Sequence, residues 1–411
     1  MLRPLRLVAG WTIALAAALL LNLALPRTTT APEGGTLSGR APSSSPAGVA
    51  PSPDGTPDVL PPVVVPPGGG IGSGSGRPVE LTPLSAEQAA ALQAATDRAR
   101  VALGLDALSV GVSVSGASGW TGASGLARDG VTRLDGTSSF AIASITKTFT
   151  ATLALQLIGE GRLSLRDEVA ELLPGVTVPQ GVKVAHLLRH TSGIADLLAP
   201  LRDRLNAKTE RIWQPEDVVA SVGSPWFAPG KAYAYSNTNY VLLGMIVERI
   251  TGRPVDVVLH ERLLAPLELT GTGMLLGEGA PFLMVPSWVS AFGTSGCMYA
   301  NAHDLLRWGD ALYGGQVLGA TGMRHMLDFT RRGYGMGAER IKVDDTPGYG
   351  HSGLLRGFTS LLVHLPTEDL TLVVMGTTNT FDPALVLSHR DRGQPSILDL
   401  ARQAVALEAA A

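Results

Sequence analysis

The chain is poor in cysteine and carries almost no excess of charge. Cys297 is the only cysteine among 411 residues, which excludes an intrachain disulfide framework and a metal site built from several thiolates. Lys and Arg total 32 against 35 for Asp and Glu, so the sequence lacks the basic field that a nucleic-acid backbone requires. We therefore expect no nucleic-acid partner, and no pattern in the sequence calls for a metal or a cofactor.

The N-terminal segment has the composition of an export signal. An apolar run from Val8 to Leu25 follows the positive residues Arg3 and Arg6. Its length is at the lower edge of the roughly 20 residues that span a bilayer, so residues 1–26 are predicted to be a cleaved signal peptide or a retained membrane anchor. The small residues of a cleavage site are poorly placed after the run, which favours retention. The positive flank predicts an exported protein of the cell envelope, membrane-anchored or secreted.

The next segment, residues 27–78, is dominated by Pro, Gly, Ser and Thr. Such a composition cannot bury enough apolar surface to fold, and it predicts a disordered, solvated linker. The folded domain is then expected to occupy residues 79–411. The whole chain is 45% hydrophobic, which is enough for a large core or for two lobes that share a cleft.

Local patterns place strands at both ends of this domain and mostly helical sequence between them. Ser85 and Gln88 form a capping box at the start of the first helix. The sequence predicts helices at residues 86–103 and about 395–410. Apolar and alternating patterns predict strands at residues 109–114, 359–364 and 370–375. This order predicts one sheet assembled from both ends of the domain, with a helical lobe inserted in its middle.

Ser144 and Lys147 form a Ser-x-x-Lys pair at the start of a predicted helix, residues 143–158. A three-residue offset puts both side chains on one helix face, so the lysine amine can reach the serine hydroxyl. The helix N-terminus favours negative charge at Ser144 and disfavours a proton on the amine. A desolvated lysine with a lowered pKa can then act as the base that activates the serine. Alone, the same pattern also fits an N-cap followed by a surface lysine.

Tyr235 and Asn237 are two residues apart in a predicted loop, ahead of an apolar helix at residues 240–250. Both side chains can point into one cleft, where a tyrosine can move protons and an asparagine can hold a substrate amide or the catalytic lysine. The alternative interpretation is a polar turn before a helix.

A third polar cluster, His351, Ser352 and Gly353, precedes the strand predicted at residues 359–364. A glycine there lets the backbone approach a ligand closely, and an edge strand can offer main-chain N–H groups to an extended acyl substrate. Taken by itself, His351 fits an ordinary polar position better than a functional one.

In this order the three clusters resemble the motif set S-x-x-K, Y-x-N and K/H-x-G of one enzyme family. That family contains class C beta-lactamases, serine D-alanyl-D-alanine carboxypeptidases and related esterases. The resemblance covers roughly residues 80–405 and extends to the sequence around the motifs. The matching surroundings are residues 161–167, 187–194, 266–269 and 293–308.

The resemblance implies an α+β fold, in which a mostly antiparallel sheet is flanked by helices and joined to a mainly helical lobe. The site is expected between the two lobes. By the family's scheme Ser144 attacks a carbonyl, Lys147 accepts its proton, and Tyr235 passes a proton to the leaving group. The backbone N–H groups of Ser144 and Leu354 would form the oxyanion hole. The substrate-binding residues implied in the same way are Asn237, His351, Ser352, Gly353 and Leu354.

His351 is the main departure from the lactamase branch, because most beta-lactamases of the family carry a lysine there. A histidine at this position resembles the carboxypeptidase and esterase branches of the family. A largely neutral imidazole binds a penicillin carboxylate less strongly than a permanent cation does. Arg356 could supply the missing charge or be a solvated loop residue. We therefore expect an exported serine hydrolase that acts by an acyl-enzyme, of the D-alanyl-D-alanine carboxypeptidase type.

Other functions fit the same residues. An esterase or a beta-lactamase would use the same catalytic groups, so the expected substrate is a peptidoglycan stem peptide, a lactam or a small ester. From a different class of protein, a sensor that is acylated by penicillin without turning over is also compatible with the sequence. The sequence leaves the oligomeric state open.

Overall fold

The structure is a computed structural model that describes residues 80–127, 129–277, 280, 284–378 and 381–410. The predicted signal or anchor segment, residues 1–26, and the predicted linker, residues 27–78, lie outside the described residues. Within the described ranges, no helix combines the length and the apolar character needed to cross a bilayer.

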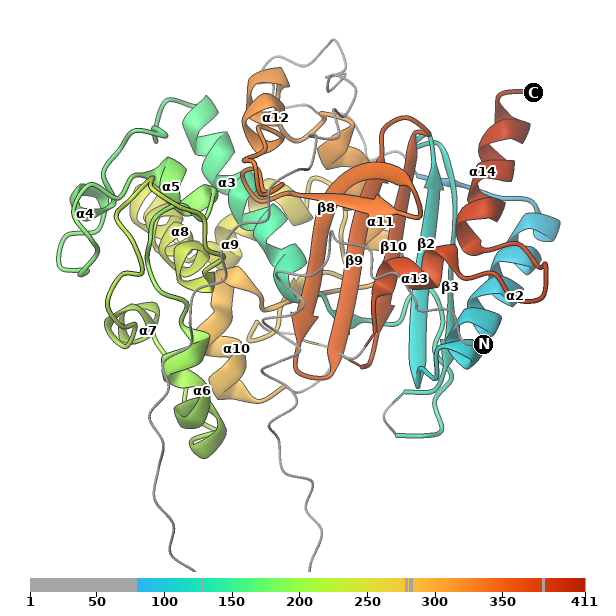
Figure 1. Ribbon diagram of the computed structural model, residues 1–411, viewed down its shortest axis with the longest axis horizontal. Helices are drawn as coiled ribbons and strands as arrows, with labels where there is room; N and C mark the ends of the chain where they lie inside the picture. Colours follow the sequence, from blue (N-terminus) through green and yellow to red (C-terminus); the bar gives the residue numbers. More distant parts are fainter. Residues whose placement is uncertain (1–79, 128, 278–279, 281–283, 379–380, 411) are drawn as a thin grey trace, which may run out of the picture. The chain divides into compact units, whose positions relative to one another are not determined.

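One large sheet of seven strands is built from both ends of the domain (Figure 1). The strand order is β1 (Thr82–Pro83), β3 (Ser118–Gly125), β2 (Ala107–Val114), β10 (Leu370–Gly376), β9 (Phe358–Leu365), β8 (Thr346–Leu355) and β7 (Glu339–Val343). Neighbouring strands of this sheet pair antiparallel, except for the edge strand β1, which pairs parallel with β3. This arrangement confirms the predicted α+β class with a mostly antiparallel sheet.

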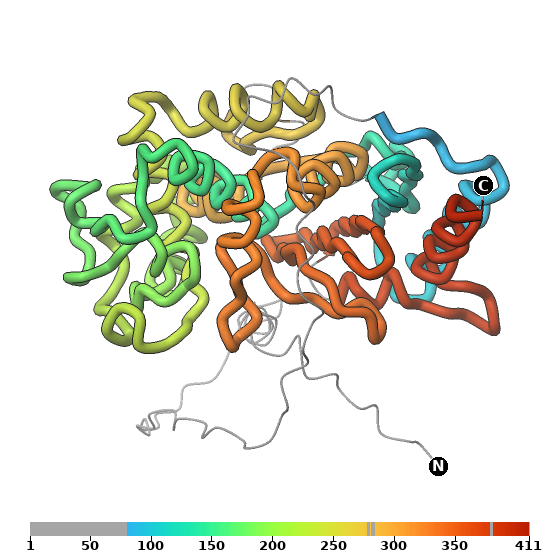
Figure 2. Tube along the Cα trace, turned by 90° about the horizontal axis from the view of Figure 1, so that it is seen from above, coloured from blue at the N-terminus to red at the C-terminus, as the bar shows by residue number. Residues whose placement is uncertain are grey.

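The inner strand β2 is buried at every residue, so both faces of the sheet must be covered. On one face, a β-carbon at Gly122 would meet Gln93 of α2 (Ala86–Ala102), which packs beside α14 (Ile397–Glu408). On the other face, a β-carbon at Gly111 would meet Leu306 of α11 (Ala302–Tyr313). Figures 1 and 2 show α2 and α14, from opposite ends of the domain, lying side by side.

The helical lobe is inserted between β3 and β7. Its longest helices, α3 (Thr146–Gly159) and α8 (Asn237–Thr251), pack against each other and are buried along most of their length. The shorter helices are α4 (Val169–Leu172), α5 (Val184–Leu188), α6 (Leu198–Ala207), α7 (Pro215–Ala220), α9 (Val255–Leu259), α10 (Pro286–Phe292) and α12 (Ala320–Met326), and α13 (Pro383–Ser388) follows the sheet. The predicted helical insertion is therefore confirmed.

Helix α3 packs against α11, the helix that covers one face of the large sheet. The Phe149 ring stacks on the indole of Trp308 with a centroid distance of 3.9 Å, and the Trp308 indole N–H donates to the Thr148 hydroxyl over 2.9 Å. Both contacts are buried, so they tie the helical lobe to the sheet close to the start of α3. This start is where Ser144 and Lys147 lie.

The structure contains strands that the sequence analysis did not predict. A small sheet joins β4 (Phe140–Ala141), β6 (Met298–Ala300) and β5 (Gly273–Met274). The strands β1, β3, β7 and β8 were also missed. The cluster of His351, Ser352 and Gly353 was expected to precede a strand, but it lies inside β8.

Candidate active site

Ser144 and Lys147 lie where a short 3-10 turn, Ala143–Ile145, runs into helix α3. The distance between Lys147 Nζ and Ser144 Oγ is 3.0 Å, so the amine and the hydroxyl are hydrogen-bonded. The lysine side chain is completely buried, whereas Ser144 keeps some exposed surface. A substrate carbonyl can therefore reach the serine but not the lysine.

The amine of Lys147 is surrounded by oxygen atoms. Besides Ser144, it contacts the side-chain oxygen of Asn237 at 2.8 Å and the backbone carbonyl of Ser295 at 2.5 Å. Burial lowers the pKa of Lys147 to about 7, although the negative charges of Asp196 and Glu339 act against this shift. Near neutral pH a large fraction of Lys147 is therefore the free amine, which is the form that can accept a proton.

The turn that carries Ser144 has an unfavourable backbone conformation that its neighbours hold in place. Ala143, directly before the serine, has a φ of 48°, a left-handed value that costs a residue with a β-carbon about 1 kcal/mol or more. The Ser360 hydroxyl donates to the Ile142 carbonyl over 2.7 Å, and the Ile142 N–H donates to the Met298 carbonyl over 3.0 Å. Strands β9 and β6 thus fix the turn that carries Ser144, called the nucleophile turn below after the role expected for Ser144, from two sides.

Gly353 allows strand β8 to lie directly against this turn. A β-carbon at position 353 would come within 2.3 Å of the Ile142 carbonyl oxygen and 2.2 Å of the Ser360 hydroxyl. The backbone of the next residue, Leu354, therefore lies beside the nucleophile turn, and its side chain is partly exposed. This closeness brings together the two backbone segments, at Ser144 and Leu354, that the resemblance assigned to the oxyanion hole.

Asn237 is held by Asp196, a half-buried aspartate. The backbone N–H and the side-chain amide of Asn237 both donate to Asp196 Oδ2, at 2.6 Å and 2.9 Å. These contacts aim the other end of the amide, its oxygen, at Lys147. The sequence analysis placed Asn237 in a loop, whereas it is the first residue of helix α8, where a free backbone N–H is available for the carboxylate.

Tyr235 lies over the amine of Lys147, with 4.8 Å between Nζ and the ring centre. Its hydroxyl hydrogen-bonds with Ser144. Burial raises the pKa of Tyr235 well above its ordinary value, so the phenol keeps its proton at every physiological pH. The structure therefore brings a basic amine and a protonated phenol to the same serine.

A layer of buried rings supports Tyr235. Its ring lies 4.3 Å from that of His190 and 6.0 Å from that of Tyr334, measured between centroids. His190 Nδ1 accepts the Ser236 N–H at 3.2 Å, and it lies 3.1 Å from the Asn239 amide nitrogen. Burial holds the pKa of His190 well below its ordinary value, so the imidazole is uncharged and packs against Tyr235 as a neutral ring.

His351 lies behind this layer and has no exposed surface. Its Nε2 is 3.1 Å from the Tyr334 hydroxyl, and its Nδ1 is 2.6 Å from the Ser352 carbonyl. Burial lowers the pKa of His351, so it is uncharged near neutral pH. Because both ring nitrogens have protein partners, His351 supports Tyr334 and β8 and presents no cation to the surface.

Ser352 is the partly exposed member of the same cluster. Its hydroxyl donates to Glu339 Oε2 over 2.9 Å, and its backbone N–H donates to the same oxygen over 3.1 Å. Glu339 is the first residue of β7, and 18% of its side chain is exposed. Arg356, the other possible source of charge, is exposed and contacts the Asn206 side-chain oxygen at 3.3 Å.

Sequence reasoning missed three residues that organise this site. They are Asp196, which orients Asn237, Tyr334, which links the rings to His351, and Glu339, which binds Ser352. Asp196 stands shortly after the family-like segment 187–194, which was a usable signal. The sequence around Tyr334 and Glu339 contains no motif that would have pointed to them.

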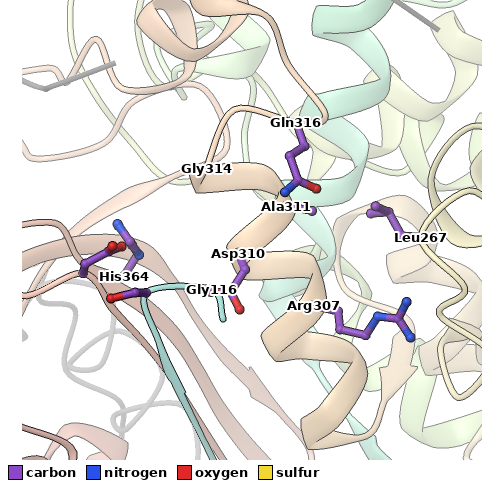
Figure 3. Close-up of a pocket in the computed structure, with 10 residues that line it drawn as sticks. Gly116, Leu267, Arg307, Asp310, Ala311, Gly314, Gln316 and His364 are labelled. Atoms are coloured by element: carbon purple, nitrogen blue, oxygen red, sulfur yellow. The ribbon is translucent and has the colours of Figure 1, made fainter. Parts of the chain in front are cut away.

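A separate cavity of about 260 Å³ lies beside α11 and shares none of its lining residues with the site around Ser144 (Figure 3). Asp310 and His364 line it. Burial raises the pKa of Asp310 to about 6 and lowers that of His364 to about 4. Among the described residues, no group of histidine, cysteine or acidic side chains is arranged to hold a metal ion.

The chain is similar in sequence to known proteins. Residues 92–393 match the family model described as Beta-lactamase. Penicillin-binding protein 4 of Amycolatopsis lactamdurans is 32% identical over 277 residues, which are 58% of this chain and 72% of that protein.

Two solved structures are also similar. A D-stereospecific amidohydrolase from a Streptomyces species is 30% identical, with a TM-score of 0.61 over 71% of this chain and 94% of that one. The D-amino acid amidase of Ochrobactrum anthropi has a TM-score of 0.66 over 79% of this chain and 100% of that one. At 22% identity the amidase supports the fold alone.

Proposed function

The chain belongs to the beta-lactamase family and is a serine hydrolase, and from that premise we propose that it cleaves the peptide or amide bond of a D-amino acyl substrate through an acyl-enzyme on Ser144. A D-alanyl-D-alanine carboxypeptidase, as expected from the sequence, is the narrower form of this proposal. We also propose that the enzyme acts in the cell envelope, on the basis of the apolar run within residues 1–26.

One observation carries the proposal. The amine of Lys147 is 3.0 Å from the hydroxyl of Ser144, and its pKa is lowered to about 7. An ordinary surface lysine is protonated at neutral pH and cannot act as a base. A buried lysine with such a pKa, hydrogen-bonded to a reachable serine, is arranged for nucleophilic catalysis.

In the acylation step, Ser144 Oγ forms a bond to the carbonyl carbon of the substrate and its proton moves to Lys147. The negative charge that develops on the carbonyl oxygen is stabilised by the N–H groups of Ser144 and Leu354. One such donor contributes about 3 to 4 kcal/mol in enzymes where it has been removed. The bond from carbon to nitrogen then breaks, and the leaving amine takes the proton of Tyr235, which regains one from Lys147.

In the deacylation step, water attacks the ester on Ser144. Lys147 and Tyr235 remove a proton from the water, and Ser144 Oγ takes it back as the ester bond breaks. His351, which contacts no solvent, acts by positioning Tyr334 behind Tyr235. Asn237, fixed by Asp196, holds the amine of Lys147 and offers its own amide to the substrate.

The D-configuration in the proposal comes from the D-stereospecific amidohydrolase of the Streptomyces species, which is 30% identical. The test is turnover of matched D- and L-alanyl p-nitroanilides together with a D-alanyl-D-alanine peptide, a chromogenic cephalosporin and p-nitrophenyl acetate. The proposal predicts turnover of the D-anilide in preference to the L-anilide, with loss of all turnover in Ser144→Ala. Preference for the L-anilide, or hydrolysis of the ester or the cephalosporin alone, would overturn it in favour of an esterase or a beta-lactamase. Acylation without turnover would identify a sensor.

A further inference from the structure

We propose that Glu339 and Ser352 make the leaving-group side of the site an acceptor of hydrogen bonds, so that the enzyme selects leaving groups that are neutral or cationic and discriminates against a free carboxylate. This inference rests on the proposed function and narrows its substrate class. It favours a D-amino acyl amidase or endopeptidase over a carboxypeptidase, because a carboxypeptidase must bind the terminal carboxylate of its substrate.

The first step is the position of Glu339 relative to the leaving group. The leaving amine has to meet the proton donor Tyr235, and the Tyr235 ring lies 6.4 Å from that of His351, the neighbour of Ser352. Glu339 is close enough to Tyr235 and Lys147 for its charge to influence the pKa of both groups. Because Ser352 is the partly exposed neighbour of His351 and binds Glu339 through its hydroxyl and its N–H, we place the amine side of the substrate next to Ser352 and Glu339.

The second step is the direction of the hydrogen bonds. The hydroxyl of Ser352 has one proton, and it donates that proton to Glu339 Oε2. The Ser352 backbone N–H is used by the same oxygen. What Ser352 and Glu339 still offer to a substrate is lone pairs, which match the N–H groups of an amide or an ammonium and do not match carboxylate oxygens.

The third step is charge. The two groups that donate to Glu339, the hydroxyl and the N–H of Ser352, are neutral. His351 Nδ1 is 3.9 Å away, but burial lowers the pKa of His351 and keeps it uncharged. Lys147 is deeply buried and engaged with Ser144, Asn237 and Ser295, and it loses its charge in the form that acts as a base.

Arg356, which follows β8 directly, is one candidate for an opposing charge. Its guanidinium donates to Asn206 of α6, which also accepts the indole N–H of Trp288 at 3.2 Å. This contact commits the guanidinium of Arg356 to α6. A substrate carboxylate placed over Ser352 would thus meet the carboxylate of Glu339 first.

The experiment uses three peptides with the same acyl part, acetyl-D-alanyl, and different leaving groups. The leaving groups are D-alanine, which ends in a carboxylate, D-alaninamide, which is neutral, and 1,2-diaminoethane, which carries an ammonium. The measurement is kcat/KM for each peptide at about pH 8, where most of Lys147 is neutral. For the parent protein we expect the neutral and cationic leaving groups to be preferred over the carboxylate by about tenfold or more, the scale of like-charge repulsion in a binding site.

Glu339→Gln removes the charge and keeps the shape, so it should reduce this preference by about tenfold, and Glu339→Arg should reverse it. Glu171→Gln, an exposed glutamate on α4, is the matched control and should leave the ratios unchanged. Equal or better turnover of the carboxylate peptide by the parent protein would overturn the inference, whatever the variants do. So would unchanged ratios in Glu339→Gln.

The same assay separates this inference from the function on which it rests. If none of the three peptides is hydrolysed but p-nitrophenyl acetate is, the proposed amide hydrolysis has failed and the inference fails with it. If the peptides are hydrolysed and the carboxylate peptide is the best substrate, the proposed function stands as a carboxypeptidase and only the role of Glu339 is refuted.

Discussion

The lowered pKa of Lys147 makes the pH dependence of acylation a direct test of its role as the base. With a pKa of about 7, roughly a tenth of Lys147 is the free amine at pH 6 and roughly nine tenths at pH 8. If the free amine accepts the proton of Ser144, kcat/KM must rise about tenfold over this interval and then level off. No falling limb should follow below about pH 10, since burial raises the pKa of Tyr235 well above its ordinary value.

The assay is hydrolysis of p-nitrophenyl acetate, whose leaving group needs no proton, so that the rate reports the base alone. The rate with Ser144→Ala, measured at each pH, is the background to subtract. Lys147→Arg keeps a positive charge at this position and removes the base, so it should lose the rise and most of the activity. A flat profile between about pH 6 and pH 8, or a midpoint near the ordinary lysine value of about 10.4, would refute the reasoning.

Further predictions concern the supports of the site and the stability of the fold. Asp196→Asn should move the midpoint of the same profile to lower pH, because the negative charge of Asp196 raises the pKa of Lys147; an unmoved midpoint would count against the coupling. Gly353→Ala should reduce kcat/KM by about a hundredfold, because its β-carbon would displace the nucleophile turn, whereas Gly223→Ala, which has open space around it, should not. Asp310 has a folded-state pKa raised to about 6, so it contributes stability below the unfolded value of 3.8 and loses it as the pH rises through 6. Asp310→Asn should therefore raise the free energy of unfolding at about pH 8 by up to about 3 kcal/mol, seen as a higher melting temperature, with no gain at about pH 4. Residues 79–411 expressed alone should fold and keep kcat/KM within about twofold of the full chain, and an unfolded product would refute the linker interpretation of residues 27–78.

The fold could be predicted from the sequence where local patterns are strong. Strands β2, β9 and β10 consist of apolar residues and small polar ones between clear turns, and their positions at both ends of the domain predict a shared sheet. Strand β8 was missed because Gly348, Gly350 and Gly353 give it no β-branched or alternating pattern. These glycines are there because neighbouring backbone or side-chain atoms lie where a β-carbon would be.

The spacing of Ser144 and Lys147 on a helix predicted their contact, because three residues make about one turn. The burial of His351 could not be predicted, since its place behind Tyr334 depends on how β8 packs against segments far away in sequence. The same holds for Asp196 and Glu339, whose partners are distant in sequence: Asp196 binds Asn237, 41 positions away, and Glu339 binds Ser352, 13 positions away. Such pairs carry no local periodicity, and only the folded chain shows them.

The most direct test of the account is to locate the acyl group during turnover. The protein is mixed with p-nitrophenyl acetate, quenched in acid within the first turnovers, digested, and mapped by mass spectrometry. The account predicts one acetyl group on the peptide that contains Ser144, absent in Ser144→Ala and strongly reduced in Lys147→Ala. An acetyl group on a different residue that persists in Ser144→Ala, together with retained hydrolysis by that variant, would contradict the assignment of Ser144 as the nucleophile.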